Sequence, residues 1–541
     1  MNDEQQSIGP QSVGQYIVAL LAANGIDTVF GIPGVHNLEL YRGLASTGLR
    51  HILVRHEQNA GFAADGFARA SGRPAAAFVI SGPGLTNILT SAAQAKTDSV
   101  PMLILASTPV EPSLAKGWGV LHELDDQRLM AAGVVGTARS ARSAEDARDH
   151  LREAFASFQL GRQRPAYLEV PLDLLAQPTS LRAERFAQVG GGPQPARTVV
   201  EKAAGLLNAA RKPVIVAGGG AKSAARPLLE LVEALDGYLV TTVAGKGLLP
   251  ECHPANLGAS LQFQTTQQLV AQADVVLAVG TELSETDFYS GARLEMTGRL
   301  IRIDIDSTKL ADHYAADVGI WGDAAASLDA LNQSLPPGGH RWRSELGPAA
   351  AHRSRIEQGF NSVYRTCSRL LSAMRAALPE DGTVFSDMTQ VAYLGNYAFA
   401  TDRPGTWLHP SGYGTLGYAL PAAIGALVAE PRRPVLALAG DFGFQFTSQE
   451  LATAVELQLS LPIVIWNNSA LGQIRDDMVA ARIPPTGIIG HNPDFLALAR
   501  AYGAHAERAL GPESLTAAIR SALLRRGPTV LEAVEADFRA Q

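Results

Sequence analysis

Two polar side chains, Asp441 and Asn468, have the residue types and the positions of ligands for a divalent metal ion. Asp441 lies in Gly440-Asp441-Phe442, and Asn468 ends the pair Asn467-Asn468, which begins after a gap of 24 residues. Each segment directly follows an apolar run of strand length. A carboxylate and an amide oxygen are hard ligands, which suit Mg²⁺ and leave coordination positions for water and phosphate. Either turn alone is common in α/β proteins, but the pair at this spacing indicates a metal site.

The elements around these residues are expected to bring them to one edge of a sheet. Between the two segments, a helical pattern begins at Thr447-Ser448-Gln449-Glu450, whose first and last residues have the spacing of a capping box. The resulting order is strand, turn, helix, strand and turn. It places Asp441 and Asn468 at the carboxyl ends of two strands, where open α/β sheets bind ligands.

This arrangement resembles the metal and diphosphate signature of the thiamine-diphosphate (ThDP) enzymes, in which GDG is followed at a similar distance by NN. Phe442 replaces the last glycine of that signature, and Gly443 follows it. The resemblance implies that Asp441, Asn468 and the backbone carbonyl of Ala470 bind Mg²⁺. It also implies that the two segments and the residues after them contact the cofactor: Asp441, Phe442, Gly443, Asn468, Ala470, Leu471 and Gly472.

The resemblance extends from about residue 10 to the C-terminus and is strongest to the branch of acetolactate synthases and 2-oxo-acid decarboxylases. Five further segments carry it, in the same order along the chain: FGIPG at 30–34, RHEQ at 55–58, GPGLTN at 82–87, PAYLEVPLD at 165–173 and GYGTLGYALPAAIG at 412–425. Each segment is weak alone, but their joint order is specific.

Size and composition describe an ordinary globular protein. A chain of 541 residues predicts about three domains, and a hydrophobic content of 46% is ordinary for a folded protein. The net charge of −7 argues against a nucleic-acid binder. The first residues lack a targeting pattern, and no apolar run approaches the ~20 residues that span a bilayer, so we expect no membrane partner and a cytoplasmic location. The two cysteines, Cys252 and Cys367, form no disulfide framework or metal motif.

The chain divides into three blocks at two linkers rich in proline and glycine, 177–197 and 335–348. The first and third blocks repeat three short patterns at offsets of 360, 361 and 363 residues: Arg73-Pro74 and Arg433-Pro434, Ser99-Val100-Pro101 and Ser460-Leu461-Pro462, and Pro165 to Glu169 and Pro528 to Glu532. We therefore predict three parallel-sheet α/β domains, of which the first and third share one ThDP-binding topology. The predicted domains are 1–176 (pyrimidine-binding), 198–335 (central) and 349–541 (diphosphate- and Mg-binding).

The central block contains a partial dinucleotide fingerprint. A predicted strand, 213–217, runs into Gly218-Gly219-Gly220, but Ser223 stands where the third glycine of the fingerprint belongs. Further buried strands are predicted at 275–280 and 300–306. Related synthases can carry FAD in this domain; here residues 281–285 replace their arginine-containing segment, which argues against FAD.

Glu57 matches the glutamate that, in this family, contacts the pyrimidine nitrogen and promotes loss of the thiazolium proton. It is followed by small and apolar residues, which favours a buried helix start. Without the resemblance, Glu57 is equally a surface residue favoured by a helix N-terminus. The matched segments around it also place Gly34 and Asn87 among the residues that bind the cofactor.

The third block carries the predicted contacts of the aminopyrimidine ring. Gly414 matches the backbone that approaches the ring, and Leu416 matches the apolar residue that holds the cofactor bent, although it also reads as a core leucine. Gln390 follows a predicted strand at 383–385, together with Asp387, in the region that contacts the diphosphate.

Two histidines are candidates for proton transfer or substrate contact. His122 lies in the loop Leu121-His122-Glu123-Leu124, where synthases tend to have glutamine and some decarboxylases place histidine. His36, next to Val35, flanks a matched motif and is expected to line the substrate pocket, whereas His56 is expected to be structural.

Acidic residues distinguish this chain from the acetolactate synthases. The Gln-Trp pair that follows the metal asparagines in those enzymes is Asp476-Asp477 here, and the loop after His122 contains Glu123, Asp125 and Asp126. Carboxylates facing the pocket would favour a substrate with a cationic tail. The combined pattern resembles the 5-guanidino-2-oxopentanoate decarboxylases; alternatively, both segments are solvated charged loops.

The sequence therefore predicts a ThDP- and Mg²⁺-dependent enzyme that decarboxylates a 2-oxo acid to an aldehyde. Acetolactate synthesis from pyruvate, a non-catalytic ThDP-binding protein and a nicotinamide oxidoreductase remain the alternatives. The family also implies self-association, as a homodimer or dimer of dimers, with each site at a subunit interface.

Overall fold

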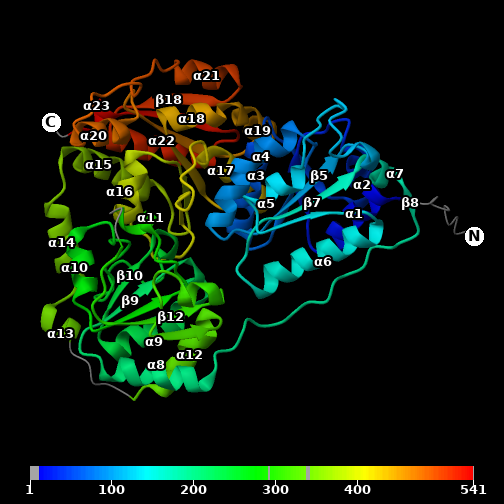
Figure 1. Ribbon diagram of the computed structural model, residues 1–541. Helices are drawn as coiled ribbons and strands as arrows, with labels where there is room; N and C mark the ends of the chain where they lie inside the picture. The colour runs from blue at the N-terminus through cyan, green and yellow to red at the C-terminus, as the bar shows by residue number, and fades with distance from the viewer. Residues whose placement is uncertain (1–10, 290–292, 337–341, 540–541) are drawn as a thin grey trace, which may run out of the picture. The chain divides into compact units, whose positions relative to one another are not determined.

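The computed structural model describes residues 11–289, 293–336 and 342–539, which form two compact units (Figure 1). The first unit runs to Gly190 and also contains Leu420–Arg432 and Thr447–Leu459. The second contains Gly191–Ala419, Arg433–Phe446 and the residues from Ser460 onward. Within the described ranges, no helix is long and apolar enough to cross a membrane.

The first unit is built on a six-stranded parallel sheet with the order β3-β2-β4-β5-β7-β6. Its strands are β2 (Thr28–Gly31), β3 (Arg50–Leu53), β4 (Ala75–Val79), β5 (Met102–Thr108), β6 (Thr137–Ser140) and β7 (Ala166–Pro171). A separate antiparallel pair joins β1 (Gln11–Ser12) to β8 (Pro178–Thr179). All residues of β4, β5 and β7 are buried, which is typical of parallel strands covered on both faces.

Helices cover both faces of this sheet, and the two that carry the predicted site lie on one of them. Phe30 of β2 packs on Phe67 of α3, whereas the preceding Val29 belongs to the core under α1 and α6. The helices are α1 (Val13–Ala23), α2 (Leu38–Thr47), α3 (Glu57–Ser71), α4 (Pro83–Thr97), α5 (Gln127–Ala132), α6 (Ala144–Leu160), α7 (Leu172–Ala176), α17 (Ala419–Ala429) and α19 (Leu451–Glu456).

Helix α17 crosses α3 at a contact that only glycine permits. A Cβ atom on Gly66 would lie 1.9 Å from the carbonyl oxygen of Ala422, and one on Gly425 would lie 1.8 Å from that of Ala63. Each helix thus contributes one glycine on which the backbone of the other rests. The crossing ties the helix that begins at Glu57 to the segment that follows the predicted pyrimidine loop.

The second unit contains a six-stranded parallel sheet of the same topology, with the order β15-β14-β16-β17-β19-β18. Its strands are β14 (Thr383–Ser386), β15 (Trp407–Leu408), β16 (Val435–Gly440), β17 (Pro462–Asn467), β18 (His505–Ala509) and β19 (Thr529–Val534). The three repeated sequence patterns fall at equivalent strands, because they precede or begin β4 and β16, β5 and β17, and β7 and β19. The predicted fold class is confirmed.

The central sheet is parallel and has the order β10-β9-β11-β12-β13. Its strands are β9 (Pro213–Ala217), β10 (Tyr238–Thr241), β11 (Val275–Val279), β12 (Arg299–Asp304) and β13 (Val318–Trp321). Helices α8 (Arg197–Ala209), α9 (Ala225–Leu235) and α12 (Ala324–Ser334) share one apolar core with one face of this sheet, and Figure 1 shows them side by side. The described part of the second predicted linker includes a short helix, α13 (Trp342–Leu346), whose Arg343 pairs with Asp236.

The remaining helices of the second unit surround its two sheets. They are α10 (Gln264–Ala271), α11 (Glu285–Phe288), α14 (Ala349–Gln358), α15 (Ser362–Ala377), α16 (Gln390–Ala398), α18 (Asp441–Thr447), α20 (Gly472–Ala480), α21 (Phe495–Ala501), α22 (Pro512–Leu524) and α23 (Glu535–Phe538). The domain boundaries predicted from the linkers stay a prediction.

Candidate active site

In each six-stranded sheet, the predicted site residues lie near the point where the strand order reverses. The chain leaves β2 toward β3 and then returns to the other side of β2 to form β4; β14, β15 and β16 repeat this path. The loops after the two inner strands therefore diverge and leave a crevice at the carboxyl edge, where open α/β sheets bind ligands. In the second sheet this edge holds Asp387, Gln390, Asp441 and Asn468.

Asp441 is the first residue of α18 and is only 3% exposed. Its donors are amides: Asn492 Nδ2 lies 2.7 Å from Oδ2, and the backbone N–H of Phe442 lies 3.1 Å from Oδ1. Burial raises the pKa of this carboxyl group, and the groups that lower it are all uncharged amides. A buried carboxylate with no cationic side chain among its described partners suits a bound cation.

The second predicted ligand, Asn468, belongs to a short polar network. Asn468 Nδ2 donates to Gln390 Oε1 over 3.4 Å, and Gln390 Nε2 donates to Asp476 Oδ2 over 2.9 Å. Gly472 leaves room for this network, because a Cβ atom there would lie 2.4 Å from Gln390 Oε1. The structure thus brings together three residues that the sequence placed in three separate motifs.

The donors of the predicted metal set are of mixed type. The described residues contain no group of three or more histidine, cysteine, aspartate or glutamate side chains that could hold a metal. Asp441, Asn468 and the Ala470 carbonyl form a different kind of set, with one carboxylate, one amide and one backbone oxygen. Ala470 precedes Leu471, whose backbone N–H donates to the Ile488 carbonyl over 2.9 Å.

Asp387 organises the loop that is predicted to approach the pyrimidine ring. It is 1% exposed, and both of its carboxylate oxygens accept from the Gly417 N–H, at 3.0 and 2.9 Å. Burial raises its pKa to about 7, while backbone N–H groups of Met388 and of Gly417 to Ala419 oppose that rise. Asp387 therefore accepts hydrogen bonds from the backbone at the start of α17, and its contact with the diphosphate stays a prediction.

Two glycines shape the same crevice. Gly414 has a φ of +73°, a conformation that favours glycine, and the exposed loop around it presents a half-buried Leu416. A Cβ atom on Gly443 would lie 3.0 Å from Asp387 Oδ2, so the absence of a side chain lets the backbone at Gly443 lie close to the Asp387 carboxylate. Phe442, which replaces the usual glycine, has its ring over Gly490 instead, where a Cβ atom would lie 2.6 Å from Cζ.

The capping box predicted at Thr447 and Glu450 is wrong. The first helix after β16 begins at Asp441, and Thr447 makes no side-chain capping bond to the single 3-10 turn that follows. Glu450 is 1% exposed, and its Oε1 accepts from the backbone N–H of Arg55 and from Asn59 Nδ2. The spacing of Thr447 and Glu450 suits a local cap, but Glu450 instead makes a tertiary contact. A buried carboxylate needs hydrogen-bond donors, and Arg55 and Asn59 supply them.

In the first unit, Glu57 occupies the position predicted for it, as the first residue of α3. His56 is the N-cap, and its Nδ1 accepts from the Gln58 N–H over 3.1 Å, which gives it the expected structural role. Glu57 is half-buried, and its Oε2 accepts from Asn87 Nδ2 over 2.9 Å. The RHEQ and GPGLTN motifs, which are 27 residues apart in sequence, thus meet through one hydrogen bond.

The two candidate histidines are in contact. Their ring centroids lie 4.8 Å apart with the planes at 71°, and His36 Nδ1 lies 2.5 Å from the buried Ser81 hydroxyl. Burial lowers the pKa of His36, and His122 lowers it further. His122 has a φ of +64°, and its Nδ1 is buried without a hydrogen-bond partner among the described residues. A buried, unsatisfied ring nitrogen beside a second imidazole is suited to exchanging a proton with a ligand.

The residues next to this pair have distinct surroundings. Val35 is 62% exposed, whereas a Cβ atom on Gly34 would lie 2.7 Å from a methyl group of Ile80. Gly34 is therefore required by packing at the turn. Gly82 N donates to Gln127 Oε1 over 3.2 Å, and a Cβ atom on Gly82 would meet the His122 carbonyl at 2.9 Å.

The acids of the His122 loop serve local structure. Glu123 accepts from four consecutive backbone N–H groups, those of residues 117–120, and Asp126 caps α5 through the Leu129 N–H. These hydrogen bonds fix the conformation of the loop that carries His122. Asp125 and Asp126 are exposed, and the expectation that this loop offers acids to a substrate stays a prediction.

The acids of α20 differ from each other. Asp476 is engaged by Gln390 and by Arg475, whose Nε lies 2.9 Å from Oδ1. Asp477 is exposed, and its Oδ1 accepts from Gln473 Nε2 over 2.9 Å. Burial raises the pKa of Tyr393, and the nearby Asp477 contributes to that rise. Asp477 is thus the more accessible carboxylate.

Four functional candidates escaped the sequence analysis: Ser81, Asn492, Glu450 and the capping role of Asp387. Ser81 stands directly before a matched glycine motif, so a polar residue at a strand end was a usable signal. Asn492 belongs to no motif and Glu450 was assigned only to the capping box, and the partners of both are distant in sequence.

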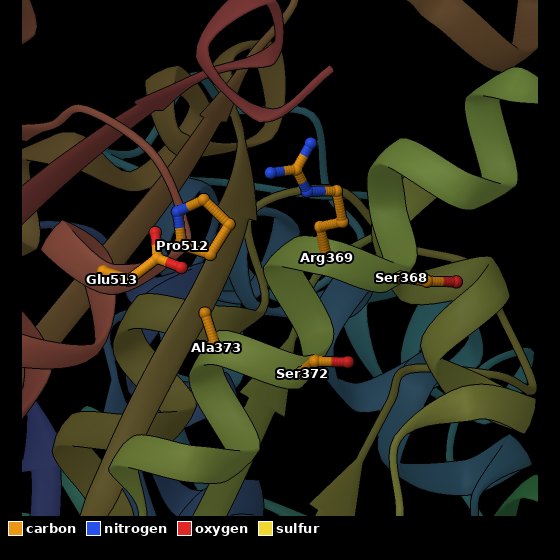
Figure 2. A pocket seen from close by; sticks show the side chains of 6 residues that line it. All are labelled: Ser368, Arg369, Ser372, Ala373, Pro512 and Glu513. Carbon is orange, nitrogen blue, oxygen red and sulfur yellow. The ribbon is translucent and has the colours of Figure 1, made fainter. Parts of the chain in front are cut away.

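Two other features lie apart from these residues. The groove in Figure 2, between α15 and α22, is lined by Ser368, Arg369, Ser372, Ala373, Pro512 and Glu513, none of which is a predicted site residue. The glycine turn 218–220 packs on a second turn, because a Cβ atom on Gly218 would lie 2.4 Å from the Gly280 carbonyl. Packing alone therefore accounts for that glycine.

Comparisons with known proteins identify the family of the chain. The chain matches the N-terminal TPP binding domain of thiamine pyrophosphate enzymes over residues 11–129, the central domain over 200–331 and the C-terminal TPP binding domain over 387–533. It is 47% identical to a probable 2-ketoarginine decarboxylase, AruI, of Pseudomonas aeruginosa, over 96% of this chain and 93% of the relative.

Acetolactate synthases are more distant relatives. The isozyme 1 large subunit of Escherichia coli (strain K12) is 31% identical over 85% of this chain and 82% of its own. A probable large subunit of Methanocaldococcus jannaschii is 31% identical over 96% and 91%. The matched domains cover both crevices described above. The chain belongs to the thiamine pyrophosphate enzymes, which use thiamine diphosphate, within a group that includes a decarboxylase and acetolactate synthases.

Proposed function

We propose that this protein decarboxylates 2-ketoarginine, that is 5-guanidino-2-oxopentanoate, with the help of ThDP and Mg²⁺ and in the cytoplasm. The observation that carries the proposal is the 47% identity, over nearly the whole chain, with a probable 2-ketoarginine decarboxylase. The exposed carboxylate of Asp477 on α20 supports a substrate with a cationic tail.

Mg²⁺ and the diphosphate would be held at the carboxyl edge of the second six-stranded sheet. Asp441, Asn468 and the Ala470 carbonyl would bind the metal, and the buried, cation-free surroundings of Asp441 support this assignment. Gln390, Leu471 and Gly472 would adjoin the diphosphate, while Gly414 and Leu416 would face the ring system. When bound, ThDP supplies a nucleophilic thiazolium carbon and holds the electron pair that remains after CO₂ departs.

Glu57 would share a proton with the pyrimidine nitrogen. Asn87 holds Oε2 of its carboxylate through a 2.9 Å hydrogen bond, which leaves Oε1 for that proton. The helix start at Glu57 fixes its direction, because His56 caps the first turn.

His122 would deliver a proton to the substrate carbon that has lost CO₂. Burial lowers the pKa of its neighbour His36, and His122 lowers it further, which favours the neutral imidazole. Ser81, 2.5 Å from His36 Nδ1, fixes the orientation of that ring. A neutral imidazole next to His122 can receive or return a proton without placing two positive charges side by side.

The guanidinium of the substrate would pair with Asp477. Asp476 would act indirectly, because its carboxylate is already bonded to Gln390 and Arg475. A cationic tail bound at Asp477 would be next to Asp476, which Gln390 links to Asn468.

We further propose that the active protein is a homodimer or dimer of dimers in which Glu57 of one subunit serves Asp441 of its partner. Large apolar side chains are exposed near the predicted residues of both crevices, including Trp118 at 65% and Leu121 at 60% in one and Tyr413 at 54% and Phe446 at 56% in the other. Such side chains are expected to be covered in a stable assembly.

One experiment tests the proposed reaction against the runner-up. The purified protein, ThDP and Mg²⁺ are incubated separately with 2-ketoarginine, an uncharged 2-oxo acid of similar length, and pyruvate, and the products are identified by mass spectrometry. Decarboxylation predicts a guanidino aldehyde and CO₂ in equal amounts from the first substrate. Acetolactate from pyruvate as the main product would instead establish the acetolactate synthase reading, which the 31% identical relatives favour.

A further inference from the structure

The buried carboxylate of Glu450 contacts the chain on both sides of Glu57. Its Oε1 lies 2.7 Å from the backbone N–H of Arg55 and 2.9 Å from Asn59 Nδ2. These residues lie two positions before and two positions after Glu57. Its other oxygen, Oε2, accepts from the Thr453 hydroxyl over 2.7 Å, so both oxygens are engaged.

The environment of Glu450 is closed. Glu450 and Asn59 are each 1% exposed, and Glu450 lies within the first compact unit together with α3. Burying a carboxylate is costly unless donors satisfy it, and here they do so with two N–H groups at one end of a helix. The hydrogen bonds of the buried Glu450 carboxylate constrain the backbone that carries Glu57.

The local backbone needs such a constraint. Arg55 and His56 precede the helix, and a helix start frays unless its free N–H groups are satisfied. His56 satisfies the N–H of Gln58 in the first turn, and Glu450 fixes the strand-like residue before it and the side chain in the third helical position. With both flanks held, the direction of the Glu57 side chain is determined.

We infer that Glu450 is a positioning residue for Glu57: it sets the geometry in which Glu57 meets the pyrimidine nitrogen without itself touching cofactor or substrate. This inference rests on the proposed role of Glu57. Displacing a catalytic group by about 1 Å can lower a rate by about 10²-fold, so a shorter side chain at position 450 is expected to slow the step that depends on Glu57.

The test compares three variants of the full-length protein loaded with ThDP and Mg²⁺. Glu450→Asp keeps the charge but draws the carboxylate one methylene away from Arg55 N. Glu450→Gln keeps the length and an acceptor oxygen for both donors. Glu456→Asp is the matched control, because Glu456 is a more exposed acid six residues later that pairs with the Arg55 guanidinium.

The readout is hydrogen–deuterium exchange at the reactive thiazolium carbon, measured without substrate, beside ThDP affinity and the thermal midpoint. Glu450→Asp is expected to slow exchange by about tenfold or more while ThDP affinity changes by less than about threefold. Glu450→Gln should recover most of the lost rate, and Glu456→Asp should exchange as the wild type does. A merely structural role would lower the thermal midpoint and leave exchange unchanged in the folded protein.

Wild-type exchange in Glu450→Asp, or equal slowing in Glu450→Asp and Glu456→Asp, would overturn the inference. The proposed function fails separately, when the wild-type protein binds no ThDP or when Glu57→Gln exchanges as fast as the wild type. Exchange needs no 2-oxo acid, so an error about the substrate leaves this experiment unaffected.

Discussion

Asn87 Nδ2 donates a hydrogen bond of 2.9 Å to Oε2 of Glu57, and so joins the N-terminal parts of α3 and α4. Both helices begin at the carboxyl edge of the first six-stranded sheet. The bond fixes one oxygen of a half-buried carboxylate and leaves the other for a ligand. It is the contact from which the catalytic role of Glu57 can be tested most directly.

Glu57→Gln is expected to slow deuterium exchange at the thiazolium carbon by orders of magnitude, because an amide cannot share a proton with the pyrimidine nitrogen. ThDP affinity should change little, since the shape and the contact with Asn87 are retained. Exchange is followed by quenched-flow NMR. An unchanged rate would move the catalytic acid to another residue.

Asp441→Ala is expected to abolish activation by ThDP and Mg²⁺, because it removes the buried carboxylate that would bind Mg²⁺. Isothermal titration of Mg²⁺ with ThDP present measures the loss. Asn492→Ala, which removes an amide donor to Asp441, should weaken binding to a smaller extent. Wild-type affinity in the Asp441 variant would refute the metal assignment.

Asp477→Asn should impair turnover of 2-ketoarginine much more than turnover of an uncharged 2-oxo acid of similar length. A hydrogen bond to a charged group contributes about 1.5–3 kcal/mol, which corresponds to about 10- to 150-fold in kcat/KM. Asp125→Asn is the control, because Asp125 is an exposed acid of the other segment. Equal losses on both substrates would remove Asp477 from substrate recognition.

His36→Asn should make the protein less sensitive to acid. The pKa of His36 is below its usual value in the folded state. Below about pH 6.5, His36 therefore binds a proton more readily in the unfolded chain than in the folded one. Its contribution to stability is present above that pH and is lost as the pH falls toward the folded pKa, by at most about 1.4 kcal/mol per pH unit. Thermal unfolding from pH 8 to pH 5 measures the difference, and identical pH profiles would contradict it.

Mixing inactive Glu57→Ala chains with inactive Asp441→Ala chains is expected to restore part of the activity. In a mixed dimer, one of the two sites would combine the intact Glu57 of one chain with the intact Asp441 of the other. Activity is measured after the chains have been allowed to exchange. An active monomer in sedimentation experiments would contradict the shared site.

The sequence by itself determined the fold class, the family and the positions of the main candidates. Asp441 and Asn468 follow buried apolar runs, and such runs in alternation with helical patterns specify a parallel sheet whose loops lie at one edge. The three repeated patterns fell at equivalent strands for the same reason, since strand spacing along the chain reflects topology. Glu57 was placed at a helix start by the small residues that follow it.

Only the tertiary structure decided which polar groups are partners. Glu450 had the spacing of a local cap but bonds to Arg55 and Asn59, almost 400 residues away in sequence. Glu123 and Asp126 had the charge of substrate ligands, but both bind backbone N–H groups. Local patterns encode backbone preferences, whereas a buried polar side chain takes whichever donor the packed chain brings within about 3 Å, and that neighbour is set by the fold as a whole.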